Sequence, residues 1–260
     1  MKNKVIVITG ASSGLGAWIA RAAARKGAKE LVLIARSEDK LLSLKEEIIK
    51  LGGNAMVLPG DITETEQVIK GVEKILREKG HIDVLINNAG YGLFEKVIDT
   101  PIEDIQGMFA VNAVGLIQMT RAVLPSMTAR KQGHIINISS QAGKIATPKS
   151  AVYSATKHAV LGFTNSLRME VEDDGIIVSA VNPGPIKTPF FEKADKQGTY
   201  EKNVEKFMLS PDKVARNTLK LIKKPKREMN LPLWMNAGAK IYGIAPRLLE
   251  RAAGKQFKQK

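Results

Sequence analysis

The stretch "KVIVITGASSGLG", residues 4–16, decides the fold of this chain. Its first half is a near-continuous apolar run, which is typical of a strand buried on both faces of a sheet. Its second half, "TGASSGLG" at 9–16, is a glycine-rich turn that opens a helix. Glycines let the backbone pass close to a pyrophosphate, and the free N–H groups of a helix N-terminus favour negative charge. The stretch therefore predicts a strand, a phosphate-binding turn and a helix.

A second interpretation of this turn remains open. The glycine spacing is Gly10-x3-Gly14-x-Gly16, which differs from the common G-x-G-x-x-G dinucleotide fingerprint. Serine and glycine are also ordinary capping residues, so the same letters fit a plain strand-to-helix turn.

Further along the chain, short apolar runs alternate with longer stretches of helical pattern. Strands are predicted over 4–10, 30–36, 54–60, 82–88, 133–139 and 175–182, with a last short strand within 227–233. Helices are predicted over roughly 14–27, 38–51, 64–79, 101–129 and 150–173. Regular alternation implies right-handed crossovers and a parallel sheet. We therefore expect a doubly wound α/β fold of the Rossmann type, with a parallel seven-stranded sheet and helices on both faces.

The composition limits the other possibilities. The 260 residues, of which 44% are hydrophobic, suffice for one domain over 1–260. The absence of cysteine excludes disulfides and thiolate metal sites, and the three histidines lack metal-ligand spacing. The N-terminal apolar run is too short for a signal peptide, and no stretch reaches the roughly 20 apolar residues of a membrane span. We therefore expect a cytoplasmic protein without a metal site.

Positive charge is concentrated near the C-terminus. The net charge is +14, and residues 211–260 hold 13 Lys and Arg against 3 Asp and Glu. This distribution argues against nucleic-acid binding and indicates contact with a phosphate, an anionic lipid or an acidic partner, although a solvated surface is the plainer interpretation. We expect 232–260 to form a basic C-terminal extension. Residues 189–210, which include "PFF" and "FML", should form a substrate lid with one short helix and favour an apolar ligand.

Apolar residues recur at near-helical spacing within the extension, at Trp234, Ala237, Ile241, Ala245 and Leu248. Basic residues flank this stripe on both sides: Lys223, Lys224, Lys226, Arg227, Arg251, Lys255, Lys258 and Lys260. One interpretation is weak association with an anionic membrane surface, with Trp234 and Tyr242 at the headgroup level. The other, which the sequence favours, is that the stripe packs over the substrate pocket or a partner subunit, because apolar stripes are usually buried.

The end of the second predicted strand bears on cofactor choice. A site for NAD usually has an acidic residue about 20 residues past the glycines, where it binds the ribose 2′-OH. Here the chain has Ala35, Arg36 and Ser37. Arg36 can pair bidentately with a 2′-phosphate, and Ser13 can add a hydroxyl, so we expect NADP(H). The alternative is a surface arginine that opens the next loop.

The motif "YSATK" at 153–157 places Tyr153 and Lys157 at i and i+4, on one side of a helix. A free tyrosine has a pKa near ~10, and a nearby ammonium would lower it toward a value useful for proton transfer. The alternative is a buried tyrosine beside a lysine whose stem covers apolar surface.

The ordered set of motifs resembles the short-chain dehydrogenase/reductase family, in its compact single-domain form. The matching motifs, in order, are "TGASSGLG" at 9–16, "GDIT" at 60–63, "NNAG" at 87–90, Asn112 in "FAVNAVG", "GHIINISSQAG" at 133–143, "YSATK" at 153–157 and "NPGPIKT" at 182–188. The resemblance covers roughly residues 3–190 and guides least over the final 70 residues.

The resemblance implies the site residues. Tyr153 would be the proton donor or acceptor, Lys157 and Asn112 would support it, and Ser140, rather than Ser139, would hold the substrate oxygen with Tyr153. The cofactor would contact Gly10, Ser12, Ser13, Gly14, Leu15, Gly16, Arg36, Asp61, Ile62, Asn87, Ala89, Gly90, Tyr153, Lys157, Pro183, Gly184, Ile186 and Thr188. Asn88 is expected to be a structural hydrogen-bonding residue.

These observations predict an NADPH-dependent oxidoreductase that transfers hydride between the nicotinamide and a small-molecule carbonyl or alcohol of apolar type. We also expect a homo-oligomer. Two other classes stay open: an NADP(H)-sensing regulator or scaffold without turnover, and a peripheral membrane protein that acts through its basic tail. The intact Tyr153 and Lys157 favour the enzyme.

Overall fold

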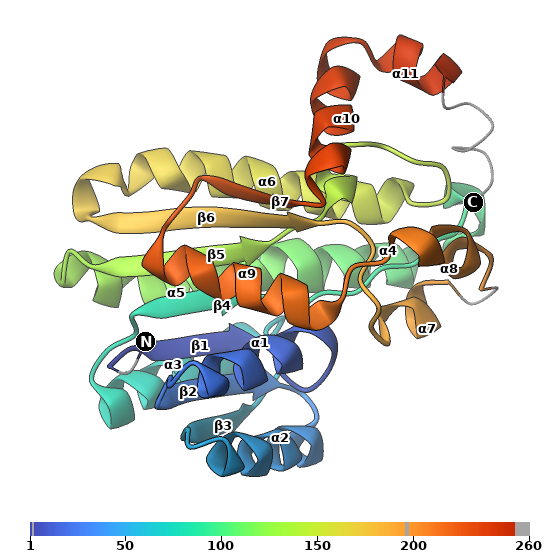
Figure 1. Ribbon diagram of the computed structural model, residues 1–260. Helices are drawn as coiled ribbons and strands as arrows, with labels where there is room; N and C mark the ends of the chain where they lie inside the picture. The colour runs from blue at the N-terminus through green and yellow to red at the C-terminus, as the bar shows by residue number, and fades with distance from the viewer. Residues whose placement is uncertain (2, 196–197, 253–260) are drawn as a thin grey trace.

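Seven parallel strands form one sheet in the order β3-β2-β1-β4-β5-β6-β7 (Figure 1). The computed structural model describes residues 1, 3–195 and 198–252. The strands are β1 (Val5–Thr9), β2 (Glu30–Ala35), β3 (Ala55–Pro59), β4 (Val84–Asn87), β5 (Gly133–Ile138), β6 (Ile176–Pro183) and β7 (Glu228–Leu231). The predicted doubly wound fold with seven parallel strands is therefore confirmed, including the short last strand.

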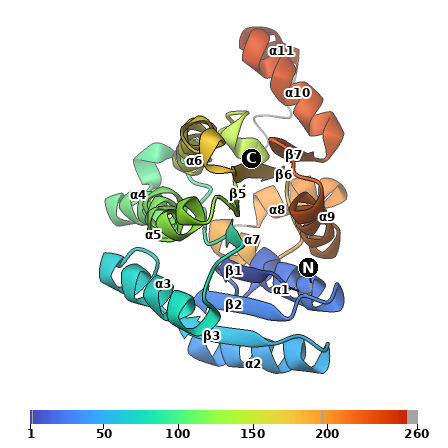
Figure 2. The ribbon, with the colours of Figure 1, turned by 90° about the vertical axis from the view of Figure 1, so that its left-hand side faces the viewer.

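Helices cover both faces of this sheet (Figure 2). They include α1 (Gly14–Arg25), α2 (Glu38–Lys50), α3 (Thr65–Lys79), α5 (Leu116–Ala129), α6 (Ala151–Glu170) and α9 (Pro211–Lys223). Alternate residues of β1 point to opposite faces: Ile6 and Ile8 pack with α1, α2 and α9, whereas Val5 and Val7 pack with α3, α5 and α6. Burial on both faces is the physical reason why β1 reads as an unbroken apolar run.

The predicted helix over 101–129 is one helical run with an irregular centre. It comprises α4 (Ile102–Phe109), a π-helical segment η2 (Ala110–Gly115) and α5. Among the described residues, only this run is long and apolar enough to cross a membrane, with a mean hydropathy of 1.3 over its best window. The run is interrupted by polar residues such as Asn112, Gln118 and Arg121, so it is not an unbroken stretch of about 20 apolar residues. Its inner side chains, which include Met119, Val123 and Met127, pack in the core beneath the sheet.

The segment after β6 differs from its prediction. Residues 189–210 contain three short helical pieces, α7 (Phe190–Ala194), α8 (Thr199–Val204) and η5 (Glu205–Phe207), where one short helix was expected. A parallel bridge between Ile186 and Leu209 joins the two ends of the segment. The segment lies beyond the carboxyl ends of the strands (Figure 1).

The described part of the C-terminal extension, residues 232–252, is largely helical and projects from the body of the molecule (Figure 1). It begins directly after β7 with α10 (Leu233–Ile244) and continues into α11 (Pro246–Ala252). The predicted flanking residues Lys255, Lys258 and Lys260 lie outside the described residues.

Candidate active site

The main cavity opens at the carboxyl ends of the strands, where the chain order reverses between β1 and β4. Ligands bind at this position in open α/β sheets, because the two neighbouring strands continue into loops that separate. The cavity measures about 1480 Å³. Since clefts for drug-sized ligands measure ~300–1,000 Å³, it has room for a large cofactor and a substrate together.

The glycine-rich turn forms one wall of this cavity. Gly10 and Gly14 have φ values of +64° and +52°, in the left-handed region that other residues adopt at a cost. A Cβ on Gly10 would lie 2.7 Å from the Cα of Ala89, and a Cβ on Gly16 would collide with the carbonyl of Gly10. The turn is therefore closely packed, and its backbone faces the cavity directly.

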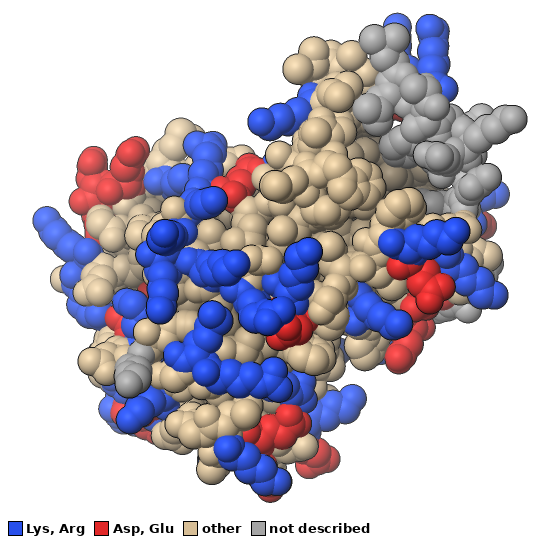
Figure 3. Space-filling view, in the orientation of Figure 1, with Lys and Arg blue, Asp and Glu red and all other residues tan. Residues whose placement is uncertain are grey.

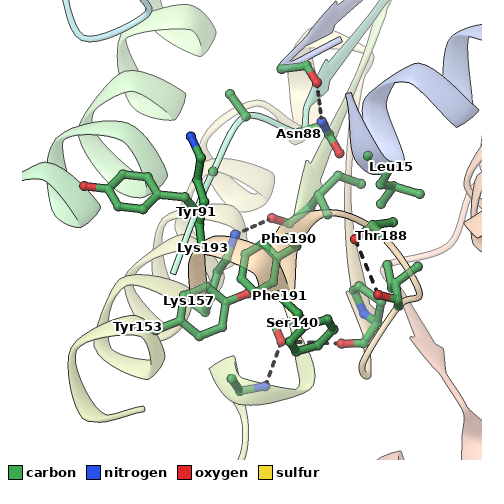
Figure 4. Close-up of a pocket in the computed structure, with 18 of the residues that line it drawn as sticks. Leu15, Asn88, Tyr91, Ser140, Tyr153, Lys157, Thr188, Phe190, Phe191 and Lys193 are labelled. Atoms are coloured by element: carbon green, nitrogen blue, oxygen red, sulfur yellow. Dashed lines mark hydrogen bonds between the residues drawn. The ribbon is translucent and has the colours of Figure 1, made fainter. Parts of the chain in front are cut away.

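Asn88 holds this turn against the end of β4. Its side-chain amide donates to the carbonyls of Thr9 at 3.0 Å and Gly10 at 3.2 Å. Figure 4 shows Asn88 at the edge of the cavity, directed toward the turn. The structure thus gives Asn88 the hydrogen-bonding position that was predicted for it.

The N-terminus of α1 points its free backbone donors into the cavity. Ser13 is the N-cap, and its hydroxyl makes no capping hydrogen bond. Ser13, Gly14 and Leu15 all line the cavity. The first N–H groups of a helix have no partner within the helix, so this end suits an anionic group such as a pyrophosphate.

Cationic and hydroxyl groups surround the end of the cavity at β2. Arg36, Ser37 and Lys40 line it beside Ser12 and Ser13. The guanidinium of Arg36 is 73% exposed, and its Nη1 atom lies 3.8 Å from a carboxylate oxygen of Asp61. Because this contact is long and the arginine side chain is exposed, it holds Arg36 only weakly, and Arg36 is available to an anionic ligand.

Tyr153, Lys157 and Ser140 meet at the opposite end of the cavity (Figure 4). Tyr153 and Lys157 come from neighbouring turns of α6, and the Nζ atom of Lys157 lies 5.7 Å from the centre of the tyrosine ring. The same Nζ donates to the carbonyl of Ile138 at 3.1 Å, at the end of β5. The sheet therefore fixes the cation beside the phenol.

Burial dominates the proton affinities of both groups. It raises the pKa of the Tyr153 phenol to about 12, and a hydrogen bond with Ser140 offsets part of this increase. Burial also lowers the pKa of Lys157 to about 8. In the chain alone, burial therefore acts against the expected lowering of the tyrosine pKa, because desolvation disfavours the phenolate.

Two adjacent serines follow β5 and have different surroundings. The hydroxyl of Ser139 is buried and donates to the backbone carbonyl of Lys157 at 3.0 Å. The hydroxyl of Ser140 lies in the cavity, accepts from the N–H of Ala142 at 3.1 Å and lies 3.4 Å from the carbonyl of Pro183. Only Ser140 can readily turn its hydroxyl to a ligand.

Asn112 supports the site from behind its wall. It is buried in η2, and its side-chain amide exchanges hydrogen bonds with the backbone of Tyr91, at 2.7 Å and 2.9 Å. Its amide also donates to the hydroxyl of Thr156 at 3.0 Å. A Cβ on Gly90 would lie 2.9 Å from Asn112 and 3.5 Å from the Nζ of Lys157, so this asparagine fixes the strand end that borders the lysine.

The structure brings most of the predicted cofactor residues to the cavity wall, with two exceptions. Gly16 lies behind the wall, against Gly10. Asn87 was expected to line the cofactor ribose, but it is buried and donates to Thr120 and Asn137 at 2.9 Å. The remaining predicted residues line the cavity: Gly10, Ser12, Ser13, Gly14, Leu15, Arg36, Asp61, Ile62, Ala89, Gly90, Tyr153, Lys157, Pro183, Gly184, Ile186 and Thr188.

This arrangement agrees with a comparison to known protein families. Residues 4–198 match the family model described as short chain dehydrogenase. The chain belongs to the short-chain dehydrogenase/reductase family.

Relatives within the short-chain dehydrogenase/reductase family include proteins with bound cofactors. "Uncharacterized oxidoreductase YxnA" of Bacillus subtilis is 36% identical over 96% of this chain and 71% of its own length. An alcohol dehydrogenase from Thermococcus sibiricus, complexed with 5-hydroxy-NADP, has a TM-score of 0.77 and 30% identity, over 88% of this chain and 94% of that chain. A Burkholderia phymatum family member in complex with NAD has a TM-score of 0.86 and 25% identity, over 94% of both chains.

The structure of this short-chain dehydrogenase/reductase also shows aromatic residues at the site that the sequence analysis did not identify. Phe94, Phe190, Phe191 and Tyr200 surround Tyr153, with ring centroids 4.7–6.2 Å apart in neighbouring pairs. Phe190 and Phe191 were noted only as part of "PFF", and Tyr200 had no motif. Tyr91 and Phe94 follow the "NNAG" motif within a few residues, and this proximity could have marked them as site residues.

Proposed function

We propose that this short-chain dehydrogenase/reductase is an NADPH-dependent carbonyl reductase, which in reverse oxidises the corresponding alcohol. The observation that carries the proposal is the joint position of Tyr153, Ser140 and Lys157 at one end of a cavity whose other end presents Arg36 and Lys40.

The cavity wall suits a dinucleotide. The glycine turn leaves its backbone bare, and the free N–H groups of α1 face the position where a pyrophosphate would lie. Ile186 and Thr188 line the same cavity beyond Pro183, near Tyr153, where a nicotinamide would fit. The bound nicotinamide would supply or accept the hydride.

The cations at β2 support NADPH over NADH. Arg36 and Lys40 would attract a 2′-phosphate, and Ser12, Ser13 and Ser37 would add hydroxyl donors. Asp61 is the carboxylate in this part of the wall, and its Oδ1 atom accepts hydrogen bonds from the N–H and hydroxyl of Thr63. The positive charges of Arg36 and Lys40 outnumber the negative charge of Asp61, and this excess favours an additional negative charge on the ligand.

The residues at the other end can deliver a proton to a carbonyl oxygen. With its pKa raised to about 12 by burial, Tyr153 is a neutral phenol at physiological pH, which is the form needed for reduction. Ser140 can donate a second hydrogen bond to the same oxygen and stabilise the charge that develops on it. Lys157, with a pKa of about 8, is mostly an ammonium at neutral pH and favours the phenolate that remains.

The aromatic side chains around Tyr153 define the substrate class. Phe94 and Phe190 pack against the ring of Tyr153, with ring centroids 5.8 Å and 5.7 Å away, and Phe191, Ile145, Phe207 and Trp234 extend the apolar lining of the cavity. We therefore infer an aldehyde or ketone with a bulky apolar substituent, which these aromatic and aliphatic side chains would contact.

Steady-state assays with NADPH and NADH, over a panel of aldehydes and ketones from small to long-chain and aromatic, test this proposal. We expect turnover with NADPH and the highest kcat/KM for the bulky apolar members. A higher kcat/KM with NADH would refute the cofactor assignment. The protein could instead bind NADPH but turn over none of the carbonyl compounds, and none of the corresponding alcohols with NADP+. That result would favour a sensor over an enzyme.

A further inference from the structure

Helix α10 exposes an apolar face that no other described part of the chain covers. Leu233, Trp234, Ile241 and Ile244 are 77%, 58%, 54% and 87% exposed, whereas Ala239 on the other side of the helix is buried. The spacing of Trp234, Ile241 and Ile244 places them along one side of the helix. Contiguous exposed groups of large apolar residues mark interaction surfaces, unlike single exposed ones.

Cations surround this apolar face. Lys240, Arg247 and Arg251 are exposed on α10 and α11, and the carboxylate of Glu250 accepts a hydrogen bond from Tyr242 at 3.2 Å. Figure 3 shows the projection as a mostly uncharged surface with blue side chains at its sides and tip. An apolar strip with basic edges is the pattern of helices that lie in a membrane interface.

The apolar face begins at the mouth of the cavity. Trp234, Met235 and Gly238 in the first turns of α10 line the cavity wall. The ring of Trp234 lies 5.7 Å from that of Phe207, which is itself 52% exposed. The predicted packing of the stripe over the pocket is therefore limited to the start of α10, and Ile241 and Ile244 lie beyond it.

Charge argues against a second copy of this chain as the occupant. A two-fold contact centred on the middle of α10 would bring Lys240 close to Lys240 of the other copy, and the two ammonium groups would repel each other. An anionic partner surface fits the same charges without repulsion.

We propose that α10 and α11 dock the protein on the surface of a bilayer that contains anionic lipid. Trp234, Ile241 and Ile244 enter the headgroup region, and the surrounding cations pair with the lipid phosphates or carboxylates. The 12 residues of α10 extend about 18 Å, well short of the ~30 Å of a hydrocarbon core, so the helix lies on the membrane. If the proposed function also holds, an apolar carbonyl substrate enters the cavity from this interface.

Co-sedimentation of the full chain with vesicles tests the proposal without any assay of activity. The vesicles are phosphatidylcholine alone, or phosphatidylcholine with phosphatidylserine, at low and high salt. We expect pelleting with the anionic vesicles at low salt, little with the neutral ones, and a loss of binding at high salt because the charges are screened.

Two matched double variants locate the contact. Ile241→Glu with Ile244→Glu should reduce the partition coefficient by about tenfold or more, because it removes two apolar insertions and adds repulsion. Leu42→Glu with Ile49→Glu, at positions 44% and 52% exposed on α2, makes the same charge change at the opposite edge of the sheet and should retain most of the binding. Circular dichroism checks that both variants fold.

Tryptophan fluorescence gives an independent readout. The chain has two tryptophans, so Trp18→Phe leaves Trp234 as the only reporter. We expect its emission to shift to the blue on anionic vesicles and to be quenched by brominated lipid. Absence of pelleting, equal pelleting by the two double variants, or an unchanged Trp234 spectrum would overturn the proposal. A vesicle-independent dimer that Ile241→Glu with Ile244→Glu abolishes would assign the face to a second copy instead.

Discussion

Neighbouring residues in this site have different roles because the backbone directs their side chains to different surroundings. Ser139 bonds the carbonyl of Lys157 inside the molecule, whereas Ser140 lies in the cavity beside Tyr153. Asn87 and Asn88 differ in the same way at the end of β4: the first points into the interior and the second reaches the glycine turn. Side chains alternate in direction along any strand, but this rule alone does not tell which of two identical neighbouring residues faces the cavity.

Substitutions at Tyr153 and Ser140 test the proton-transfer role. Tyr153→Phe should lower kcat by at least ~10²-fold while NADPH affinity stays within a few-fold, because the ring and its packing remain and the acid is lost. Ser140→Ala should also lower kcat severely, whereas the matched Ser139→Ala should have a mild effect. Steady-state assays measure kcat, and fluorescence titration measures the affinity for NADPH. The reverse order of the two serines would show that the wrong hydroxyl is assigned.

Arg36 provides a test of cofactor choice. Arg36→Asp should weaken NADPH binding by roughly ten- to a hundredfold, since a charge-assisted contact contributes ~1.5–3 kcal/mol, and should affect NADH far less. Arg77→Asp, at an exposed position on α3 outside the cavity, is the matched control and should leave both affinities unchanged. Titrations of the two cofactors decide between the outcomes, and an equal loss for NADH would contradict a 2′-phosphate contact.

Lys157 predicts how reduction depends on pH. Burial lowers its pKa to about 8, so the ammonium is present below that pH and is lost as the pH rises through it. Tyr153, with a pKa of about 12, keeps its proton over the same range. We expect kcat/KM for carbonyl reduction to decline as the pH rises through about 8. A profile that stays flat to pH ~10 would be inconsistent with a role for this ammonium.

At the scale of whole elements, the strands and long helices follow from the sequence, whereas the short helices within residues 189–210 do not. Buried strands such as β1 carry an apolar signal in every residue, so their positions can be predicted locally. Residues 189–210 lack such a signal because their short helices pack by isolated aromatic side chains, such as Phe191 against Tyr200. The π-helical turn η2 was not predictable for a related reason, since its geometry is set by the contacts of Asn112 with Tyr91 and Thr156.

The aromatic side chains of α7 should control substrate size preference. Phe190→Ala should raise KM for aromatic ketones by about tenfold and change kcat/KM for a small aldehyde little, because the lost contact is with the apolar substituent that a small aldehyde lacks. Phe109→Ala, which truncates a partly exposed phenylalanine outside the cavity wall, is the control. A uniform loss for all substrates would indicate general damage to the lid.

At the scale of the whole molecule, a buried histidine links stability to pH. His134 in β5 is 5% exposed and bonds Ser179 at 2.9 Å, and burial lowers its pKa to about 4. A histidine in the unfolded chain has a pKa near ~6.5. Between about pH 4 and pH 6.5, the folded state therefore binds fewer protons than the unfolded state. The neutral imidazole therefore contributes stability above about pH 6.5, and up to about 3 kcal/mol is lost as the pH falls toward 4.

Urea unfolding at pH 7.5 and pH 4.5 checks this prediction. His134→Gln keeps a side-chain donor toward Ser179 and removes the titrating group, so its free energy of unfolding should fall less on acidification than that of the unmodified protein. Equal losses in the two proteins would show that other groups dominate acid sensitivity.

The bridge between Ile186 and Leu209 joins the two ends of residues 189–210, the segment that we propose as the substrate lid. The N–H of Leu209 donates to the carbonyl of Pro185 at 2.8 Å, and the N–H of Lys187 donates to the carbonyl of Leu209 at 3.0 Å, so both ends of the segment are tied at one point. For protein engineering, this joint marks natural cut sites for exchanging the lid as a cassette. A library of segments of varied length that replace residues 189–208 and keep Ile186, Thr188 and Leu209 would change substrate range while the sheet and the cofactor wall stay as they are.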